Sequence, residues 1–251
     1  FSLDGKRLLA IGQGQIILID TQAGRELIRF NIDRGQTESP YRVAFNPDGK
    51  TIATVGSDFR VHFYDLQTGK EVQTMAQPDV KENIYSIAYS PTGRYQILRV
   101  SLTKHYLAEM IIRDTQTQQD VQRLESQLMP IFSPNEKFLV VPKDREITIL
   151  DTEKWLERAS FKVQNVEVIA FAPHSDRFVT TELDAVKIWD LNLSPAATSY
   201  AIDNVLANRI TFSPDSKKVY AHAYSATQDK YSIVKGWELT TQREVNSFQT
   251  T

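Results

Sequence analysis

The chain has 251 residues, 41% of them hydrophobic and 24% charged, so it can bury a sizeable core and is neither disordered nor membrane-embedded. A net charge of −2, from 29 basic and 31 acidic residues without a basic block, gives no electrostatic footprint for nucleic acid. The absence of cysteine excludes thiol catalysis, thiolate metal sites and disulfides.

A sequence repeat of about 40 residues organises the whole chain. Its first landmark is an aromatic residue followed by a turn rich in Pro, Asp and Gly, and the six copies start at Phe1, Phe45, Tyr89, Phe132, Phe171 and Phe212. The second landmark is an acidic residue that ends a short apolar run, at Asp20, Asp65, Asp114, Asp151, Asp190 and Glu238. Ten residues later comes a large apolar side chain, at Phe30, Met75, Leu124, Phe161, Tyr200 and Phe248.

Each copy predicts four short strands, here called a to d in chain order. In the clearest copy, strand a covers residues 41–45 and ends in the turn 46–49, where Pro presets one dihedral angle and Gly accepts a positive one. Strands b, c and d follow at 51–55, 61–64 and 71–75. Their apolar runs of about four to eight residues, separated by turn residues, are typical of strands.

A Gln-rich segment, residues 115–129, also has apolar residues at helical spacing, and in isolation it could form a helix. Its residues 120–124 lie at the same offsets from Asp114 as residues 71–75 lie from Asp65. The repeat therefore predicts a d strand here.

A four-stranded unit cannot bury both of its faces alone, so the units must stack, and stacked twisted sheets curve into a ring. We therefore predict an all-β fold in which residues 1–251 form a single β-propeller domain of four-stranded antiparallel blades. The repeats lie approximately at 1–30, 41–75, 84–124, 128–161, 166–200 and 207–248. The first lacks strand a, so we expect either six blades, the first completed from elsewhere, or seven blades with upstream residues.

Residues 45–72 resemble a WD repeat, and so does Val186-Lys-Ile-Trp-Asp190. The resemblance covers essentially the full chain, in copies of unequal clarity. The family's Gly-His pair occurs in no copy, and the other family residues are matched most clearly by Trp189, Trp237, Asp58 and Asp144. We therefore expect the His/Asp/Ser/Trp hydrogen-bond network of that family to be mostly missing and the blades to be held by packing.

Catalytic and metal-binding motifs are not apparent. The four histidines, His62, His105, His174 and His222, show no ligand-like spacing. Most carboxylates recur at repeat positions, where an acid bonds the local backbone. We expect no catalytic residue, no cofactor and no metal.

The resemblance implies that partners bind on the face formed by the d-to-a and b-to-c loops. On this face lie the long segments 31–40, 101–106 and 224–231. Aromatic residues, Met and Arg are enriched at interface hot spots, and the candidates are Arg42, Phe59, Tyr85, Met129, Arg145, Glu167, Arg209 and Tyr231.

Two functions follow as hypotheses. The first is a non-catalytic protein-interaction or sensing scaffold that binds a protein or peptide. We expect it to be part of a larger multidomain protein, and the resemblance implies that residues upstream could form an effector domain. The alternative is a propeller enzyme or small-ligand binder with a site in the central channel, for which Asn83, Glu167 and Asn208 are the nonrepeated polar candidates. No apolar run approaches the roughly 20 residues that span a bilayer, so we expect no membrane partner. From the charge balance we expect no nucleic-acid partner, and we expect a cytoplasmic location.

Overall fold

A computed structural model describes most of the chain: residues 2, 4–12, 14–31, 42–75, 82–102, 108–126, 128–143, 145–164, 166, 168–182, 185–191, 198–201, 205–225, 232–241 and 243–250. These residues form strands and turns. Within them there is no helix with the length and apolar character that crossing a membrane requires.

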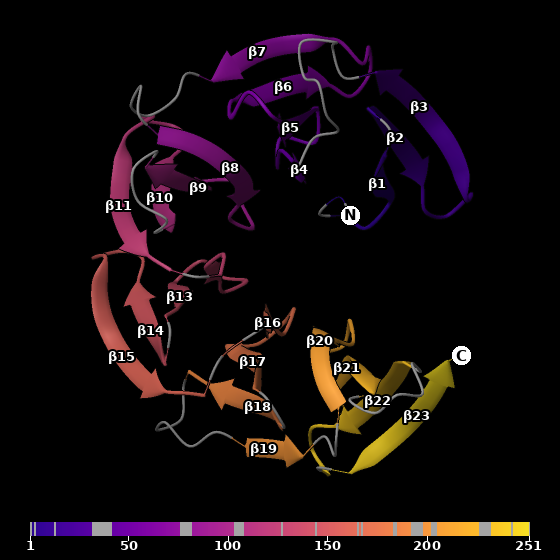
Figure 1. The fold of residues 1–251 in the computed structure, drawn as a ribbon, viewed down its shortest axis with the longest axis vertical. Helices are drawn as coiled ribbons and strands as arrows, with labels where there is room; N and C mark the ends of the chain where they lie inside the picture. Colours follow the sequence, from indigo (N-terminus) through magenta and orange to yellow (C-terminus); the bar gives the residue numbers. More distant parts are fainter. Residues whose placement is uncertain are drawn as a thin grey trace. The chain divides into compact units, whose positions relative to one another are not determined.

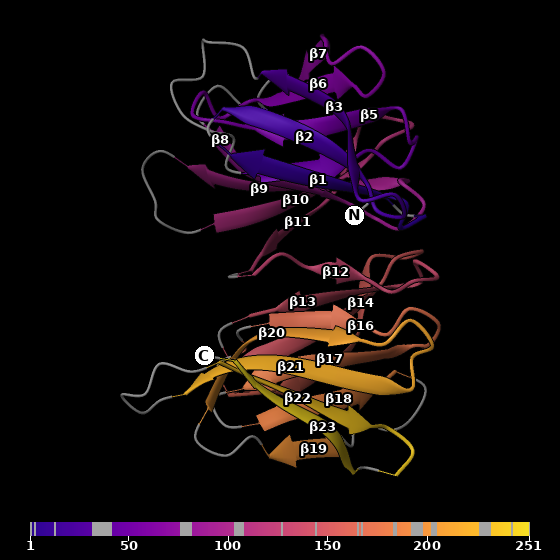
Figure 2. The ribbon, with the colours of Figure 1, turned by 90° about the vertical axis from the view of Figure 1, so that its right-hand side faces the viewer.

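The chain divides into two compact units, and unit 1 comprises Phe1–Glu125. It contains three antiparallel sheets whose strands pair in chain order (Figures 1 and 2). The three-stranded sheet consists of β1 (Arg7–Gly12), β2 (Gln15–Asp20) and β3 (Arg25–Asn31). The two four-stranded sheets consist of β4 (Arg42–Phe45), β5 (Thr51–Val55), β6 (Val61–Asp65) and β7 (Glu71–Met75), and of β8 (Glu82–Tyr89), β9 (Tyr95–Leu102), β10 (Ala108–Asp114) and β11 (Asp120–Glu125).

Unit 2 comprises Ser126–Thr251 and contains three four-stranded antiparallel sheets. The first consists of β12 (Ile131–Phe132), β13 (Phe138–Pro142), β14 (Glu146–Asp151) and β15 (Leu156–Lys162). The second consists of β16 (Val168–Phe171), β17 (Arg177–Glu182), β18 (Ala185–Asp190) and β19 (Thr198–Ala201). The third consists of β20 (Val205–Phe212), β21 (Lys218–Ser225), β22 (Ser232–Glu238) and β23 (Glu244–Thr250).

The strands predicted from the clearest copy are confirmed at β4 to β7. The turn between β4 and β5 closes as its sequence requires, because the N–H of Gly49 donates to the Asn46 carbonyl at 3.0 Å while Gly49 has φ of +67°. The Gln-rich segment forms strand β11, which confirms the d strand and excludes the helix there. The first sheet has three strands among the described residues, as the missing strand a predicts.

Each unit is held together by apolar residues that fill the spaces between neighbouring sheets. In unit 1, the sheet β4–β7 lies between the other two (Figure 1). Ile52 and Tyr64 pack toward β1–β3, whereas Ala53 and Val61 pack toward β8–β11, and all four are buried. The sheet β4–β7 therefore has two buried faces, which explains why its inner strands read as continuous apolar runs.

The apolar residue ten positions after a repeat acid joins neighbouring sheets in two copies. In each of them it lies on the d strand and its ring stacks on a residue of the c strand of the following sheet. In unit 1 the ring of Phe30 stacks on Tyr64, with centroids 5.9 Å apart, and in unit 2 Phe161 stacks on Trp189 at 5.1 Å. In these two copies the repeated apolar residue is therefore a contact between sheets.

One hydrogen bond of the family's side-chain network is present in unit 2. Trp189 Nε1 on β18 donates to Thr180 Oγ1 on β17 at 3.0 Å, and both side chains are buried. Asp144 lies outside the described residues. Closure of the sheets into a propeller ring, and the number of blades in it, stay predictions from the repeat.

Candidate interaction surfaces

The turn between β5 and β6 presents an aromatic side chain from a strained backbone position. Phe59 has φ of +58°, in the left-handed region that bulky residues rarely adopt. The turn is fixed by two backbone hydrogen bonds, from Phe59 N–H to the Gly56 carbonyl at 3.1 Å and from Ile84 N–H to the Phe59 carbonyl at 3.2 Å. The second bond attaches the turn to strand β8 of the neighbouring sheet.

Phe59 contacts Tyr85, a second predicted residue, on strand β8. Their ring centroids are 5.0 Å apart with the planes tilted by 55°. The register between β8 and β9 shifts between Ile84 and Ser86, so Tyr85 is the extra residue of a bulge. Its side chain is 37% exposed, and the structure thus brings these two candidates together at the surface of unit 1.

An ionic network supports this turn from the same sheet. His62 Nε2 on β6 lies 2.7 Å from Asp58 Oδ2 of the turn, and His62 Nδ1 lies 3.0 Å from Glu71 Oε1 on β7. Thr74 Oγ1 donates to the same Glu71 oxygen at 2.5 Å. Asp58 directly precedes Phe59, so the network ties the strained position to two strands.

The network changes the pKa values of its members. Burial lowers the pKa of His62, but hydrogen bonds to Glu71 and Asp58 outweigh it, and the net pKa is raised above its ordinary value. Burial raises the pKa of Glu71, but hydrogen bonds from Thr74 and His62 outweigh it, and the net pKa is lowered. Both shifts favour the charged forms of His62 and Glu71, as expected for two groups that form an ion pair.

Arg42 is exposed at the first residue of β4, where it pairs in register with Val55, the last residue of β5. It therefore lies at the same end of the sheet as the turn that carries Phe59.

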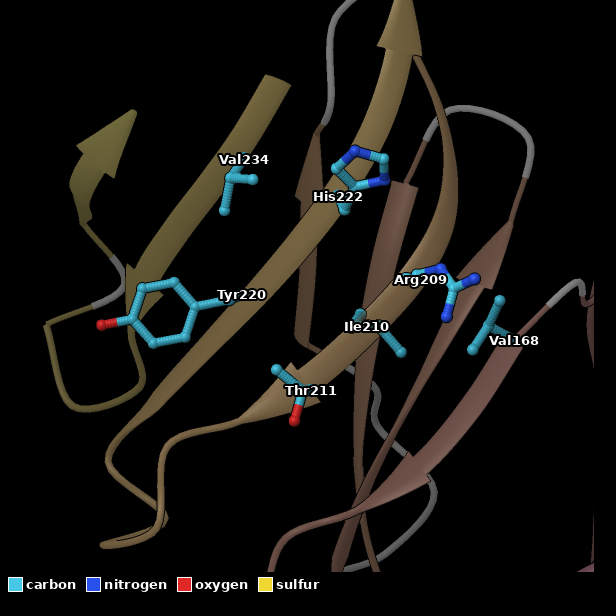
Figure 3. A pocket seen from close by; sticks show the side chains of 7 residues that line it. All are labelled: Val168, Arg209, Ile210, Thr211, Tyr220, His222 and Val234. Carbon is cyan, nitrogen blue, oxygen red and sulfur yellow. The ribbon is translucent and has the colours of Figure 1, made fainter. Parts of the chain in front are cut away.

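Unit 2 has a groove around a fourth predicted residue, Arg209. The groove has a volume of about 650 Å³, and its lining side chains are drawn in Figure 3: Val168, Arg209, Ile210, Thr211, Tyr220, His222 and Val234. Arg209 pairs in register with His222, and Thr211 with Tyr220. The exposed guanidinium of Arg209 lies among apolar and aromatic side chains, an environment suited to a carboxylate.

The remaining candidates are dispersed or not described. Met129 is half-buried before β12, and Arg145 is exposed in the turn between β13 and β14, where its carbonyl accepts a hydrogen bond from Val163 N–H at 3.0 Å. Glu167 and Tyr231 lie outside the described residues, as do the loops 32–40 and 226–231 and the insert 103–106. Of the alternative's candidates, Asn83 is half-buried on β8 and Asn208 lies on β20.

The histidines do not form a shared site in the described part of the chain. His174 is exposed in the turn between β16 and β17, and His105 lies outside the described residues. Among the described residues, no group of three or more His, Asp and Glu side chains is arranged to hold a metal ion.

Sequence reasoning did not find the network around His62. Asp58 and His62 are four residues apart across a tight turn, but Glu71 joins them only through the pairing of β6 with β7. The sequence does place an ionisable residue in the turn, on β6 and on β7 of the same repeat, but the repeat pattern does not show that their side chains meet.

Comparison with protein families gives one match. The family described as WD domain, G-beta repeat, matches residues 29–65, which confirms the resemblance to WD repeats in this segment. No curated protein matches the chain. The matched segment runs from the end of β3 through β4 and β5 to the last residue of β6, so it includes the turn that carries Phe59.

Proposed function

We propose that this chain, which carries a WD repeat at residues 29–65, is a non-catalytic interaction module that binds a protein or peptide through Phe59 and Tyr85. WD repeats are typical of protein-interaction scaffolds, and the matched repeat holds one half of this aromatic pair. The observation that carries the proposal is a bulky side chain kept at positive φ with its ring against an exposed tyrosine.

Positive φ at Phe59 supports a functional reading together with its ring contact to Tyr85, since the turn residues Gln118, Glu136, Trp155 and Ser216 also have positive φ. A non-glycine residue in the left-handed region costs about 1–3 kcal/mol, and such residues cluster at binding and active sites. The corresponding turn between β1 and β2 has a glycine, Gly14, with φ of +74°. A glycine would therefore satisfy the turn, whereas Phe59 adds an aromatic surface of the kind that dominates binding energy at interfaces.

The groove around Arg209 supplies a second contact of different chemistry. Its guanidinium would pair with an acidic side chain or the C-terminal carboxylate of the partner, and its apolar walls would cover an adjoining side chain. A ligand of this groove would therefore carry an acidic residue next to an apolar one, whereas a ligand of the aromatic pair in unit 1 would carry an aromatic or aliphatic anchor. A sensing role, membership of a larger multidomain protein and a cytoplasmic location extend the same proposal.

The test uses the full-length protein with Phe59→Asn and Tyr85→Ala, because asparagine tolerates positive φ and so removes the ring with little strain. The matched control is Leu156→Thr, which changes a 64%-exposed apolar residue of unit 2. Affinity capture followed by measurement of Kd should identify a partner that wild type and the control bind equally and that the two variants bind at least about tenfold more weakly.

Chemical denaturation of each variant establishes that it is folded. A captured partner whose affinity for Phe59→Asn and Tyr85→Ala equals that for wild type would exclude the aromatic pair as the binding site.

A further inference from the structure

Sheet β8–β11 has polar residues at repeat positions where the other sheets are apolar. Tyr89 on β8, Gln96 on β9 and Arg113 on β10 are register partners across this sheet. At the position of Gln96 the other sheets have Leu8, Ile52, Leu139, Phe178 and Val219. At the position of Arg113 the other sheets have Ile19, Tyr64, Leu150, Trp189 and Trp237. At the position of Tyr89, the other sheets with a described strand a have Phe45, Phe132, Phe171 and Phe212.

Gln96 is the least expected of the three. It is 5% exposed, and its Oε1 has no hydrogen-bond partner among the described residues, while its Nε2 lies 3.4 Å from Tyr89 Oη. A buried amide oxygen without a donor is costly, and most such atoms in native proteins bind a water or a ligand. A position that is apolar in five sheets and polar in one therefore requires a reason other than packing.

A cleft lies in front of this row, within unit 1. It has a volume of about 250 Å³ and separates sheet β8–β11 from sheet β4–β7. Asn46, Asp48 and Thr51, in and beside the turn between β4 and β5, line one wall, and Tyr89 and Gln96 line the other. Because Phe59 follows the opposite end of β5, this cleft is separate from the aromatic pair.

Among the described residues that line the cleft, one side chain is charged, that of Asp48. Its Oδ1 accepts hydrogen bonds from the N–H groups of Lys50 at 2.7 Å and Thr51 at 3.0 Å, which hold the carboxylate without neutralising it. Arg113 does not line the cleft, and its Nε donates to Asp120 Oδ1 at 2.7 Å. An anion is therefore disfavoured, and the hydrogen-bonding groups of Gln96 and Tyr89 are neutral, which favours an uncharged molecule.

The unused hydrogen-bonding groups require a ligand that both donates and accepts. Burial, with a smaller contribution from Asp48, raises the pKa of Tyr89, so its hydroxyl stays protonated. Its oxygen accepts from Gln96 Nε2, which leaves its hydrogen for another acceptor. Next to it, Gln96 Oε1 needs a donor. Neighbouring hydroxyl groups on one molecule satisfy both requirements, because each hydroxyl donates and accepts.

We propose that this cleft binds a small uncharged polyol of monosaccharide size. One hydroxyl donates to Gln96 Oε1, which has almost no exposed surface in the free protein and becomes accessible when the side-chain amide turns toward the cleft, and the neighbouring hydroxyl accepts from Tyr89 Oη. At about 30 Å³ for each water, the cleft has room for about eight water molecules, which is enough for one sugar ring. The ring of Tyr89 and the side chain of Met75 supply the apolar surface for its C–H face. This site does not depend on the proposed interaction function.

Methionine methyl groups report on the site directly. The chain has three methionines, of which Met75 lines the cleft, Met110 is fully buried and Met129 belongs to unit 2. We expect at least one probe among D-glucose, D-galactose, D-mannose, D-ribose and myo-inositol to shift the ¹³C-methyl NMR signal of Met75 saturably. The signals of Met110 and Met129 should stay in place.

Two variants test the assigned contacts, and a third is a control. Gln96→Leu should weaken binding by about tenfold or more while raising the Tm of the free protein, because leucine occupies this position as Leu139 in another sheet. Tyr89→Phe should weaken binding in the same way. Phe59→Asn should keep the sugar response, so failure of the interaction function and failure of this site are distinguishable.

The contrary outcomes are equally specific. If no probe shifts the Met75 signal, the cleft holds ordered water only and the proposal is wrong. A response that is equal in wild type and Gln96→Leu would reflect general exclusion of polyols from the protein surface and would also overturn it.

Discussion

His62 is held between two carboxylates, so each of its ring nitrogens has an acidic partner. A protonated imidazole can donate to both carboxylates, whereas a neutral imidazole has one N–H and can donate to only one of them. The turn that carries Phe59 is therefore anchored by an interaction that depends on pH. The sign of that dependence follows from the directions of the two resolved pKa shifts.

We predict that the network stabilises the folded protein in a window of mildly acidic pH. The raised pKa of His62 gives a contribution that is complete below its ordinary value of 6.5 and is lost as the pH rises through the folded value. The lowered pKa of Glu71 gives a contribution that is complete above its ordinary value of 4.5 and is lost as the pH falls through the folded value. Urea denaturation of wild type and His62→Gln from pH 4 to about pH 9 should show the largest difference between these limits.

The control for this prediction is His174→Gln, which removes an exposed histidine without a carboxylate partner among the described residues. A constant difference between wild type and His62→Gln across the whole pH range would contradict the ionic network and indicate a packing role for the ring.

For single residues, residue type and repeat position could indicate candidates but not the contacts between them. Phe59, in a turn, is half-buried, and Tyr85, the fourth residue of β8, is exposed; a contact of either with a partner stays a prediction. The exposure of Tyr85 depends on a one-residue bulge, which leaves no mark in a strand pattern. The row through Gln96 could have been found by aligning the repeats position by position, because its polarity differs from that of every other copy.

Among the strands of unit 2, β17 and β18 are joined by the bond from Trp189 to Thr180 in addition to their backbone pairing. We predict that Thr180→Val lowers the free energy of unfolding by about 1–3 kcal/mol, because it leaves a buried indole N–H without an acceptor. The measurement is the urea midpoint at a constant m-value.

Thr148 on β14 provides the matched control. It is 3% exposed, and its hydroxyl has no hydrogen-bond partner among the described residues. Thr148→Val therefore removes an unsatisfied polar atom at nearly constant volume, and it should be neutral or stabilising. If both variants lower the free energy of unfolding equally, the loss comes from side-chain packing and not from the indole hydrogen bond.

Elements were largely predictable because their boundaries are set by local turn chemistry. The turn at residues 46–49 fixes the end of β4 and the start of β5, and repeat register assigned β11 correctly where helical spacing suggested otherwise. The bulges in β8 and β20 were not predictable, since a strand with one extra residue has the same composition as one without it.

Over the whole molecule, the nearly balanced charge leads to a prediction about partners. We expect no binding of labelled duplex DNA or single-stranded RNA in fluorescence anisotropy at about 150 mM salt, because a net charge of −2 releases few counterions. Binding that strengthens steeply as the salt concentration falls would contradict this prediction and indicate a local basic surface.

The fold class followed from the repeat because a unit of four short strands has few ways to bury two apolar faces. Closure of a ring does not follow in the same way, since it depends on small angles between sheets that no residue type encodes. The function was predictable only as a class, because the repeated residues build the scaffold, whereas a partner is selected by surface residues that differ from copy to copy.

The WD match begins in β3 and ends with β6, so the unit of sequence is out of phase with the sheet by one strand. Duplication or loss of one such segment would join the outer strand of one sheet to the three inner strands of another. Each new junction would have to preserve a contact like that of Phe30 with Tyr64. A chain that gains or loses such a segment therefore keeps its sheets packed only if the new boundary again supplies this contact, so the phase of the repeat couples each sheet to its neighbour along the chain.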